Sequence, residues 1–168
     1  MTELDGLKKE QIFEKYPFLV MRTPWDGHVI EDTEITEYDN CPVGWREIFL
    51  DVIKVISSSY DNWTKKQKQD FYFTDIKEKF GALRIYTSFS TDKISNAIEY
   101  AETTSAYTCI ECGAQPQTKK NRIIWQTRGY ILPFCKDCMM RKIYEKDSHF
   151  IKDDFVKITR RKSSFKEI

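Results

Sequence analysis

The chain has 168 residues and a formal net charge of +1, with 40% hydrophobic, 14% aromatic and 32% charged residues. This aromatic content is enough for a buried core, which excludes a wholly disordered or low-complexity chain. No apolar run approaches the roughly 20 residues that cross a bilayer, and the acidic N-terminus lacks the apolar part of a secretory signal, so we expect a cytoplasmic protein with no membrane contact.

The first half of the chain predicts two helices separated by an irregular segment. Residues 7–16 have helical spacing, and Pro17 ends that helix. Residues 17–44 hold three prolines, two glycines and six acids, which predicts a long irregular segment, and we interpret its acidic stretch at 26–39 as a solvated loop. Residues 43–56 place apolar side chains at helical intervals and predict the main core helix, which we expect the serines at 57–59 and then Asp61 and Asn62 to end.

The next segment predicts a β-hairpin followed by a helix. Residues 70–89 alternate between apolar and polar side chains around a bend at Phe80 and Gly81, with Phe71, Phe73 and Asp75 on one face. A serine or threonine at 90–91 then caps a helix that reaches about residue 104.

Four of the five cysteines form two Cys-x-x-Cys pairs, Cys109 with Cys112 and Cys135 with Cys138. Two such pairs supply four thiolates to one tetrahedral ion and leave no open position, which predicts a structural Zn²⁺ rather than a catalytic metal. The alternatives are a redox-active pair and four unrelated core thiols. Cys41 stands apart, and we interpret it as a small buried residue rather than a reactive thiol.

The residues between and after the pairs predict the shape of the zinc module. Residues 122–126 and 130–134 favour two strands joined by a turn at Gly129, and a helix over 137–146 carries the second pair. A knuckle, a hairpin and a helix in this order resemble a treble-clef zinc finger, whereas a zinc ribbon would hold the second pair in another knuckle.

We therefore predict an α+β fold in which helices and a β-hairpin pack with a C-terminal treble-clef-like zinc finger. The expected parts are residues 1–106, the zinc module at 107–147, and a basic tail at 148–168, all in one compact unit. The oligomeric state is left open.

Several motifs between residues 15 and 140 resemble a family of small proteins that are encoded by bacteriophages and prophages and mostly described without a known function. They are Cys41-Pro-Val-Gly-Trp-Arg-Glu-Ile48, Ile76-Lys-Glu-Lys-Phe-Gly-Ala-Leu-Arg-Ile-Tyr86, Thr108-Cys-Ile-Glu-Cys-Gly113 and Leu132-Pro-Phe-Cys-Lys-Asp-Cys138. The resemblance implies a phage setting and a host-cell cytoplasm, but no reaction and no catalytic residues.

The chain carries no strong catalytic motif. An HNH-type nuclease needs a histidine in the zinc finger, but the only two, His28 and His149, lie outside it. Asp75 and Lys77 match the acid-x-Lys element of metal-dependent nucleases, although charged residues on a solvated strand explain them equally. The acids between residues 26 and 39 lack the spacing of a calcium loop and are also suited to a basic partner.

The near-neutral net charge conceals an asymmetry. Residues 1–108 carry 13 basic and 19 acidic residues, a balance of −6, and residues 109–168 carry 14 and 7, a balance of +7. Basic residues in the second part could contact nucleic-acid phosphates. The candidates are Lys119, Lys120, Arg122, Arg128, Arg141, Lys142, Arg160, Arg161 and Lys162. Trp125 and Tyr130 are candidate base-stacking residues, or core residues.

Three functions follow as hypotheses. The first is a non-catalytic phage accessory protein with a structural zinc, which binds and modulates a host protein and is a candidate defence component. The second is a nucleic-acid-binding zinc-finger protein or regulator. The third is a metal-dependent nuclease that uses Asp75 and Lys77.

Overall fold

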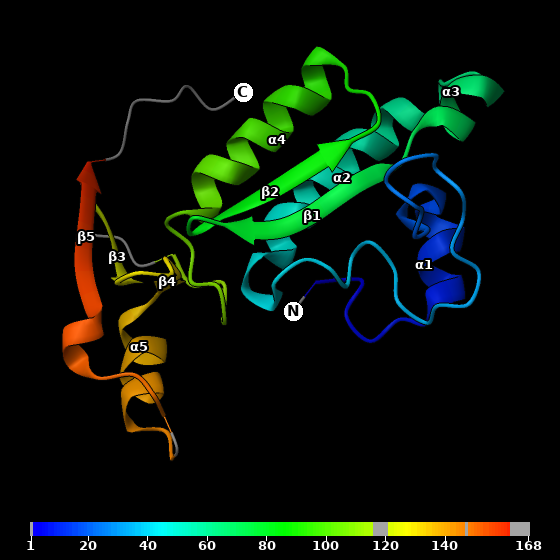
Figure 1. The fold of residues 1–168 in the computed structure, drawn as a ribbon. Helices are drawn as coiled ribbons and strands as arrows, with labels where there is room; N and C mark the ends of the chain where they lie inside the picture. The colour runs from blue at the N-terminus through cyan, green and yellow to red at the C-terminus, as the bar shows by residue number, and fades with distance from the viewer. Residues whose placement is uncertain (1, 116–120, 147, 162–168) are drawn as a thin grey trace.

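The computed structural model describes residues 2–115, 121–146 and 148–161, and these residues form a mixed helix and sheet protein (Figure 1). Within them lie five α-helices, three short 3₁₀ turns and two small antiparallel sheets. The elements are α1 (Lys9–Lys15), η1 (Pro17–Leu19), η2 (Val43–Trp45), α2 (Arg46–Tyr60), α3 (Lys65–Asp70), β1 (Phe73–Lys79), β2 (Ala82–Thr87), α4 (Asp92–Ser105), β3 (Asn121–Thr127), β4 (Pro133–Phe134), α5 (Lys136–Tyr144), η3 (Lys152–Asp154) and β5 (Phe155–Arg161). None of the helices in the described ranges is long and apolar enough to span a bilayer.

Helix α2 is the centre of the larger core, as its apolar spacing predicts. Phe49, Val52, Ile53 and Ile56 are each at most 1% exposed, and they follow one another at helical intervals. Of the two expected stops, Asp61 is confirmed as the C-cap residue, whereas the serines at 57–59 lie inside the helix, which continues to Tyr60. The hydroxyls of Ser58 and Ser59 donate to the carbonyl oxygen of Val55, so both are satisfied inside the helix and do not end it.

The predicted hairpin is confirmed as β1 and β2, which lie in front of α2, with α4 beside β2 (Figure 1). Its expected alternation is wrong at the start of β1, where the register shifts between Phe73 and Asp75. This irregularity breaks the period of two, so that Phe73 and Ile76 are both buried. The bend at Phe80 and Gly81 is confirmed, since Lys79 pairs with Ala82 across it.

Helix α3 has no counterpart among the predicted elements. Its six residues, Lys-Lys-Gln-Lys-Gln-Asp, include no apolar side chain, and none of them is buried. The sequence feature that favours this helix is at its start. The Thr64 hydroxyl accepts a hydrogen bond from the backbone N–H of Gln67, and the Gln67 side chain accepts one from the Thr64 N–H. This capping box stabilises a helix that has no apolar face.

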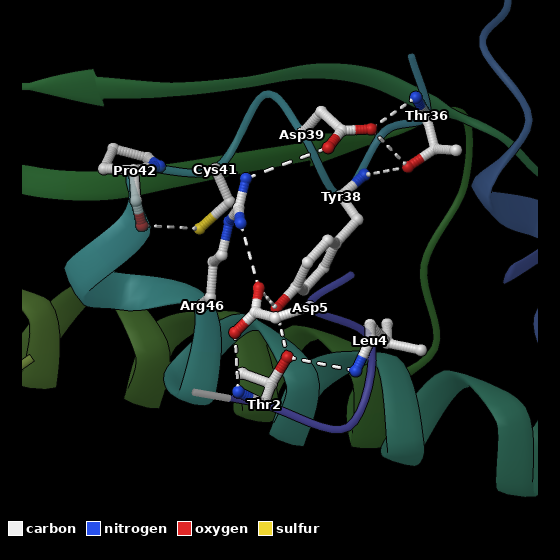
Figure 2. Close-up of polar contacts among 9 residues, drawn as sticks. All are labelled: Thr2, Leu4, Asp5, Thr36, Tyr38, Asp39, Cys41, Pro42 and Arg46. Carbon is white, nitrogen blue, oxygen red and sulfur yellow. Dashed lines mark hydrogen bonds and ion pairs between the residues drawn. The ribbon is translucent and has the colours of Figure 1, made fainter. Parts of the chain in front are cut away.

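The acidic segment, residues 26–39, is held in place at its C-terminal end by the side-chain contacts that Figure 2 shows. The Asp39 carboxylate accepts hydrogen bonds from the Thr36 backbone N–H at 2.7 Å and from its hydroxyl at 2.9 Å. Arg46 of α2 pairs with Asp5 at 2.9 Å and with Asp39 at 3.8 Å, and its guanidinium lies 4.8 Å from the centre of the Tyr38 ring. The interpretation of the acidic stretch at 26–39 as a solvated loop is therefore wrong around residue 38, where these contacts hold the chain in the core.

Glu37 makes the stability of this region depend on pH. Its side chain is 3% exposed, and burial raises its pKa from 4.5 to about 7. Between these two values the unfolded chain is ionised while the folded chain retains the proton, so stability falls as pH rises through this window and is constant above it. We expect the free energy of unfolding to fall by on the order of 3 kcal/mol between pH 4 and pH 8.

The substitution Glu37→Gln isolates this effect. Denaturant unfolding at several pH values should show that the variant lacks this decline, because the amide does not titrate. Identical pH profiles for the two proteins would contradict a buried, protonated Glu37.

The C-terminal sheet has the strand order β4-β3-β5. The hairpin expected from residues 122–126 and 130–134 is confirmed in its pairing, with Trp125 opposite Phe134, but its second strand covers only Pro133–Phe134 and not residues 130–132. The expected tail is wrong for residues 155–161, which form strand β5 and pair along the whole of β3. Strand β5 has one fully buried apolar side chain, Phe155, so its local pattern is weak, and only pairing with distant residues defines it.

Candidate metal centre

The four paired cysteines come together in one cluster, as their spacing predicts. Their sulfur atoms all lie within 4.8 Å of one another. Cys109, Cys135 and Cys138 are buried, and Cys112 is exposed. No other group of three or more potential ligands from His, Cys, Asp and Glu occurs in the part of the chain that the structure describes.

Each cysteine pair is held by its own local structure. The first pair lies in a knuckle, where the Gly113 N–H donates to the Cys109 carbonyl oxygen at 3.0 Å and Gly113 adopts a φ of +74° that suits glycine. The second pair begins α5, where Cys135 is the N-cap residue and its sulfur accepts from the Cys138 N–H at 3.4 Å. A knuckle and a helix start thus present two sulfurs each to the same point.

The cluster has the dimensions of a metal–thiolate site. A tetrahedral ion with metal–sulfur bonds of about 2.3 Å requires sulfur–sulfur distances of about 3.8 Å. The sulfurs of Cys112 and Cys135 lie 3.7 Å apart, and all four cysteines are free of disulfide bonds. The residues are therefore positioned to bind one metal ion, with all four ligands supplied by the chain.

The pKa values of the cysteine thiols depend on whether the cluster holds a cation. Burial, and then hydrogen bonding with neighbouring cysteine sulfurs, raises the pKa of Cys138, and burial raises that of Cys112. Cys112 and Cys138 would thus resist ionisation without an ion. Although burial opposes it, backbone N–H groups of Cys135 and Cys112 lower the pKa of Cys109, so the thiols differ in their protonation. A bound dication deprotonates all coordinating thiols.

Glu111 links the knuckle to α5, and no sequence motif indicates this role. Its carboxylate accepts from Arg141 at 2.6 Å and from Lys142 at 2.8 Å. Arg141 also lies 3.4 Å from the Cys138 sulfur, where its charge offsets that of the thiolates. Arg141 and Lys142, which were predicted to contact phosphates, therefore pair instead with Glu111 in the loop that carries the first cysteine pair.

The knuckle docks on the start of α2. The Gly44 N–H donates to the Ile110 carbonyl oxygen at 2.9 Å, and the indole N–H of Trp45 donates to the Thr108 carbonyl oxygen at 2.9 Å. Trp45 is fully buried. A Cβ atom on Gly44 would lie 2.5 Å from the Ile110 carbonyl carbon, so only glycine allows this approach.

The other predicted basic residues are spread over the C-terminal sheet. Arg128 is exposed beside the β3–β4 turn. Arg122 of β3 lies opposite Arg160 of β5, and Arg161 lies opposite Asn121. Lys119, Lys120 and Lys162 fall outside the described residues. Of the two candidate stacking residues, Trp125 packs against the smaller core, whereas Tyr130 is 71% exposed.

The candidate nuclease residues pair with each other on the hairpin. Lys77 makes an ion pair with Asp75, so its charge is already compensated. His28 contacts Asp26 on an exposed turn, and His149 is exposed after α5. Neither histidine is part of the cysteine cluster.

Cys41 lies apart from the cluster, at the start of the segment that leads into η2. It is 2% exposed, and burial raises the pKa of its thiol to about 12. Such a thiol stays protonated and is a poor nucleophile, which agrees with a packing role.

Comparisons of this chain with protein-family models, with curated proteins and with solved structures give no match, so the resemblance to phage proteins stays a prediction.

Proposed function

We propose that this chain is a non-catalytic binding protein, in which a structural zinc in a treble-clef-like module stabilises the fold and a rigid turn around Trp25 docks on a partner protein. The treble-clef assignment is supported by a knuckle that carries the first cysteine pair and a helix start that carries the second. Four thiolates are a preferred ligand set for Zn²⁺ and leave no position for a substrate. The phage setting and the host origin of the partner rest on the motif resemblance.

The single observation that carries the binding function is the exposure of Trp25. Its side chain is 87% exposed, although tryptophan is among the costliest residues to leave in water. Val29 and Ile35, farther along the same segment, are 45% and 47% exposed. Exposed apolar side chains along one segment, with a tryptophan among them, are typical of a protein-binding surface.

The turn that presents Trp25 is held in one conformation. The Thr23 N–H donates to the His28 carbonyl oxygen at 2.9 Å, the Gly27 N–H donates to that of Thr23 at 3.0 Å, and the Thr23 hydroxyl bonds to Asp26. The Arg22 guanidinium donates to the Gly27 carbonyl oxygen at 3.0 Å. A turn whose backbone is already held in place loses less conformational entropy on binding, which favours affinity.

The charge around Trp25 indicates the chemistry of the partner. Residues 23–45 contain no lysine or arginine and carry six acids, of which Asp26, Glu31, Asp32 and Glu34 are exposed or partly exposed. Complementary charge steers association and excludes like-charged partners. We therefore propose an apolar pocket with a basic rim as the surface that receives Trp25.

Replacing Trp25 by alanine is the direct test. Truncation of a buried interface tryptophan costs 2 kcal/mol or more, so we expect binding to the partner to weaken at least about 30-fold. The tagged protein should first capture the partner from nuclease-treated host lysate. Titration of that purified partner by calorimetry would then measure the dissociation constants of the wild-type and variant proteins.

Tyr144→Ala is the matched control, because Tyr144 is 77% exposed but lies on α5. It should leave the dissociation constant unchanged. Equal affinities for the wild-type protein and Trp25→Ala, or a partner that requires nucleic acid for capture, would overturn the proposal.

A further inference from the structure

The tip of the β1–β2 hairpin holds an aromatic residue in an unfavourable conformation. Phe80 has a φ of +55° and is followed by Gly81 at +77°, and two positive φ values in succession are typical of a tight hairpin turn. Asparagine, aspartate or glycine normally occupies the first position, since a bulky side chain is strained there. The Phe80 side chain is 73% exposed, so burial does not compensate this strain.

A second exposed aromatic residue is fixed beside this tip. Tyr130 follows β3 and is 71% exposed, and its hydroxyl donates to the Glu78 carboxylate at 2.5 Å. A Cβ atom built on Gly81 would lie 2.7 Å from the Ile131 side chain, so the turn packs directly on the next residue. Residues on both sides of Phe80 therefore contact the segment that carries Tyr130.

Two cations that are close in sequence to these aromatic residues, Lys79 before Phe80 and Arg128 two positions before Tyr130, have no acidic side-chain partner among the residues that the structure describes. Lys79 is exposed, and its ammonium lies 5.6 Å from the centre of the Phe80 ring. Arg128 is exposed, and its Nε donates to the backbone carbonyl oxygen of Asp153 at 2.9 Å. The Glu78 carboxylate accepts from the Gly81 N–H as well as from Tyr130. Lys79 and Arg128 thus offer two unpaired positive charges to a ligand.

We propose that Phe80 and Tyr130 form a stacking platform for single-stranded nucleic acid, whose phosphates contact Lys79 and Arg128. Exposed aromatic rings beside cations are the usual way of binding single strands without sequence preference, because every base has a face that can stack. A duplex hides those faces and should bind less well. This surface is distinct from the Trp25 turn and does not depend on the function proposed for it.

The variant Phe80→Asn separates binding from folding. Asparagine tolerates positive φ, so this variant should unfold at an equal or higher denaturant concentration than the wild-type protein while it loses the ring. Fluorescence anisotropy of the full-length, zinc-loaded protein with a labelled oligo-dT strand at low salt should show roughly 5- to 150-fold weaker binding. Tyr130→Ala should weaken binding to a similar degree.

Three further measurements complete the test. Tyr130→Phe should bind normally, because the ring remains, and so should Tyr100→Ala, which removes an aromatic residue that is 60% exposed on α4. Joint replacement of Lys79 and Arg128 by glutamine should lower the slope of log affinity against log salt by about 1.4. Undetectable binding of oligo-dT, or equal affinity in Phe80→Asn and Tyr130→Ala, would overturn the proposal. Loss of a captured protein partner in Phe80→Asn without a change in oligo-dT affinity would also overturn it, and would assign the tip to protein binding.

Discussion

Replacement of Cys112 by serine is expected to remove the metal and unfold the C-terminal module. Cys112 is the exposed member of the cluster, so this change alters buried apolar area little and acts chiefly through coordination. Structural zinc contributes about 10–16 kcal/mol to the folding of zinc-finger peptides, and loss of one of four ligands forfeits much of it. Elemental analysis should give one zinc per wild-type chain and well below one per variant chain.

The effect of Cys112→Ser should extend beyond metal content. The smaller core consists of residues around the cysteines, including Phe134, Met139 and Phe155, and the metal joins the two segments that enclose it. We expect near-ultraviolet circular dichroism to lose signal in the variant, and in wild-type protein treated with a chelator, because aromatic side chains in this module lose their fixed packing.

Cys41→Ala is the matched control, since Cys41 is buried but lies outside the cluster. It should keep one zinc per chain and lose only about 1 kcal/mol of stability from a small cavity. A full complement of zinc in Cys112→Ser, or an absence of zinc from the wild-type protein, would refute the metal centre.

Gly44→Ala should destabilise the whole chain by about 3 kcal/mol or more. The added methyl group would overlap backbone atoms of Ile110, and backbone cannot rotate away as a flexible side chain can. Relief of the clash would separate the knuckle from α2 and break the hydrogen bonds that Gly44 and Trp45 donate to it. Denaturant unfolding, followed by tryptophan fluorescence, measures this loss.

Gly129→Ala distinguishes a clash from ordinary backbone strain. Gly129 has a φ of +81° and open space around it, so alanine there should cost about 1–2 kcal/mol through its conformation alone. Gly44 has no such positive φ, and its cost should come from the contact with the knuckle. Equal and small losses in the two variants would show that the two parts of the molecule are not docked in this way.

Short-range patterns were sufficient for the strongest elements of this protein. Helix α2 follows from apolar residues at helical spacing, the β1–β2 hairpin follows from alternation around Gly81, and the metal ligands follow from two Cys-x-x-Cys pairs. In each case the residues that define the feature are close in sequence and share one period or spacing, so no distant contact was needed to recognise them.

The elements that were missed depend on contacts that sequence spacing does not encode. Helix α3 has no apolar face, and β5 is defined by pairing with β3, whose partner residues lie 28 to 40 positions earlier in the chain. Glu37 was expected among solvated acids, but the fold encloses it and raises its pKa. Arg141 and Lys142 were expected to be available for phosphate, but Glu111 compensates their charge.

The sequence by itself determined that this chain folds around an aromatic core and that four cysteines can converge on one ion, because both properties are written in composition and local spacing. Tertiary structure alone decided which surface residues remain available for binding. Trp25, Phe80 and Tyr130 are exposed while Trp45 and Phe49 are buried, although all five are aromatic. Burial depends on which distant segments pack over a side chain, and that information arises only when the chain is folded.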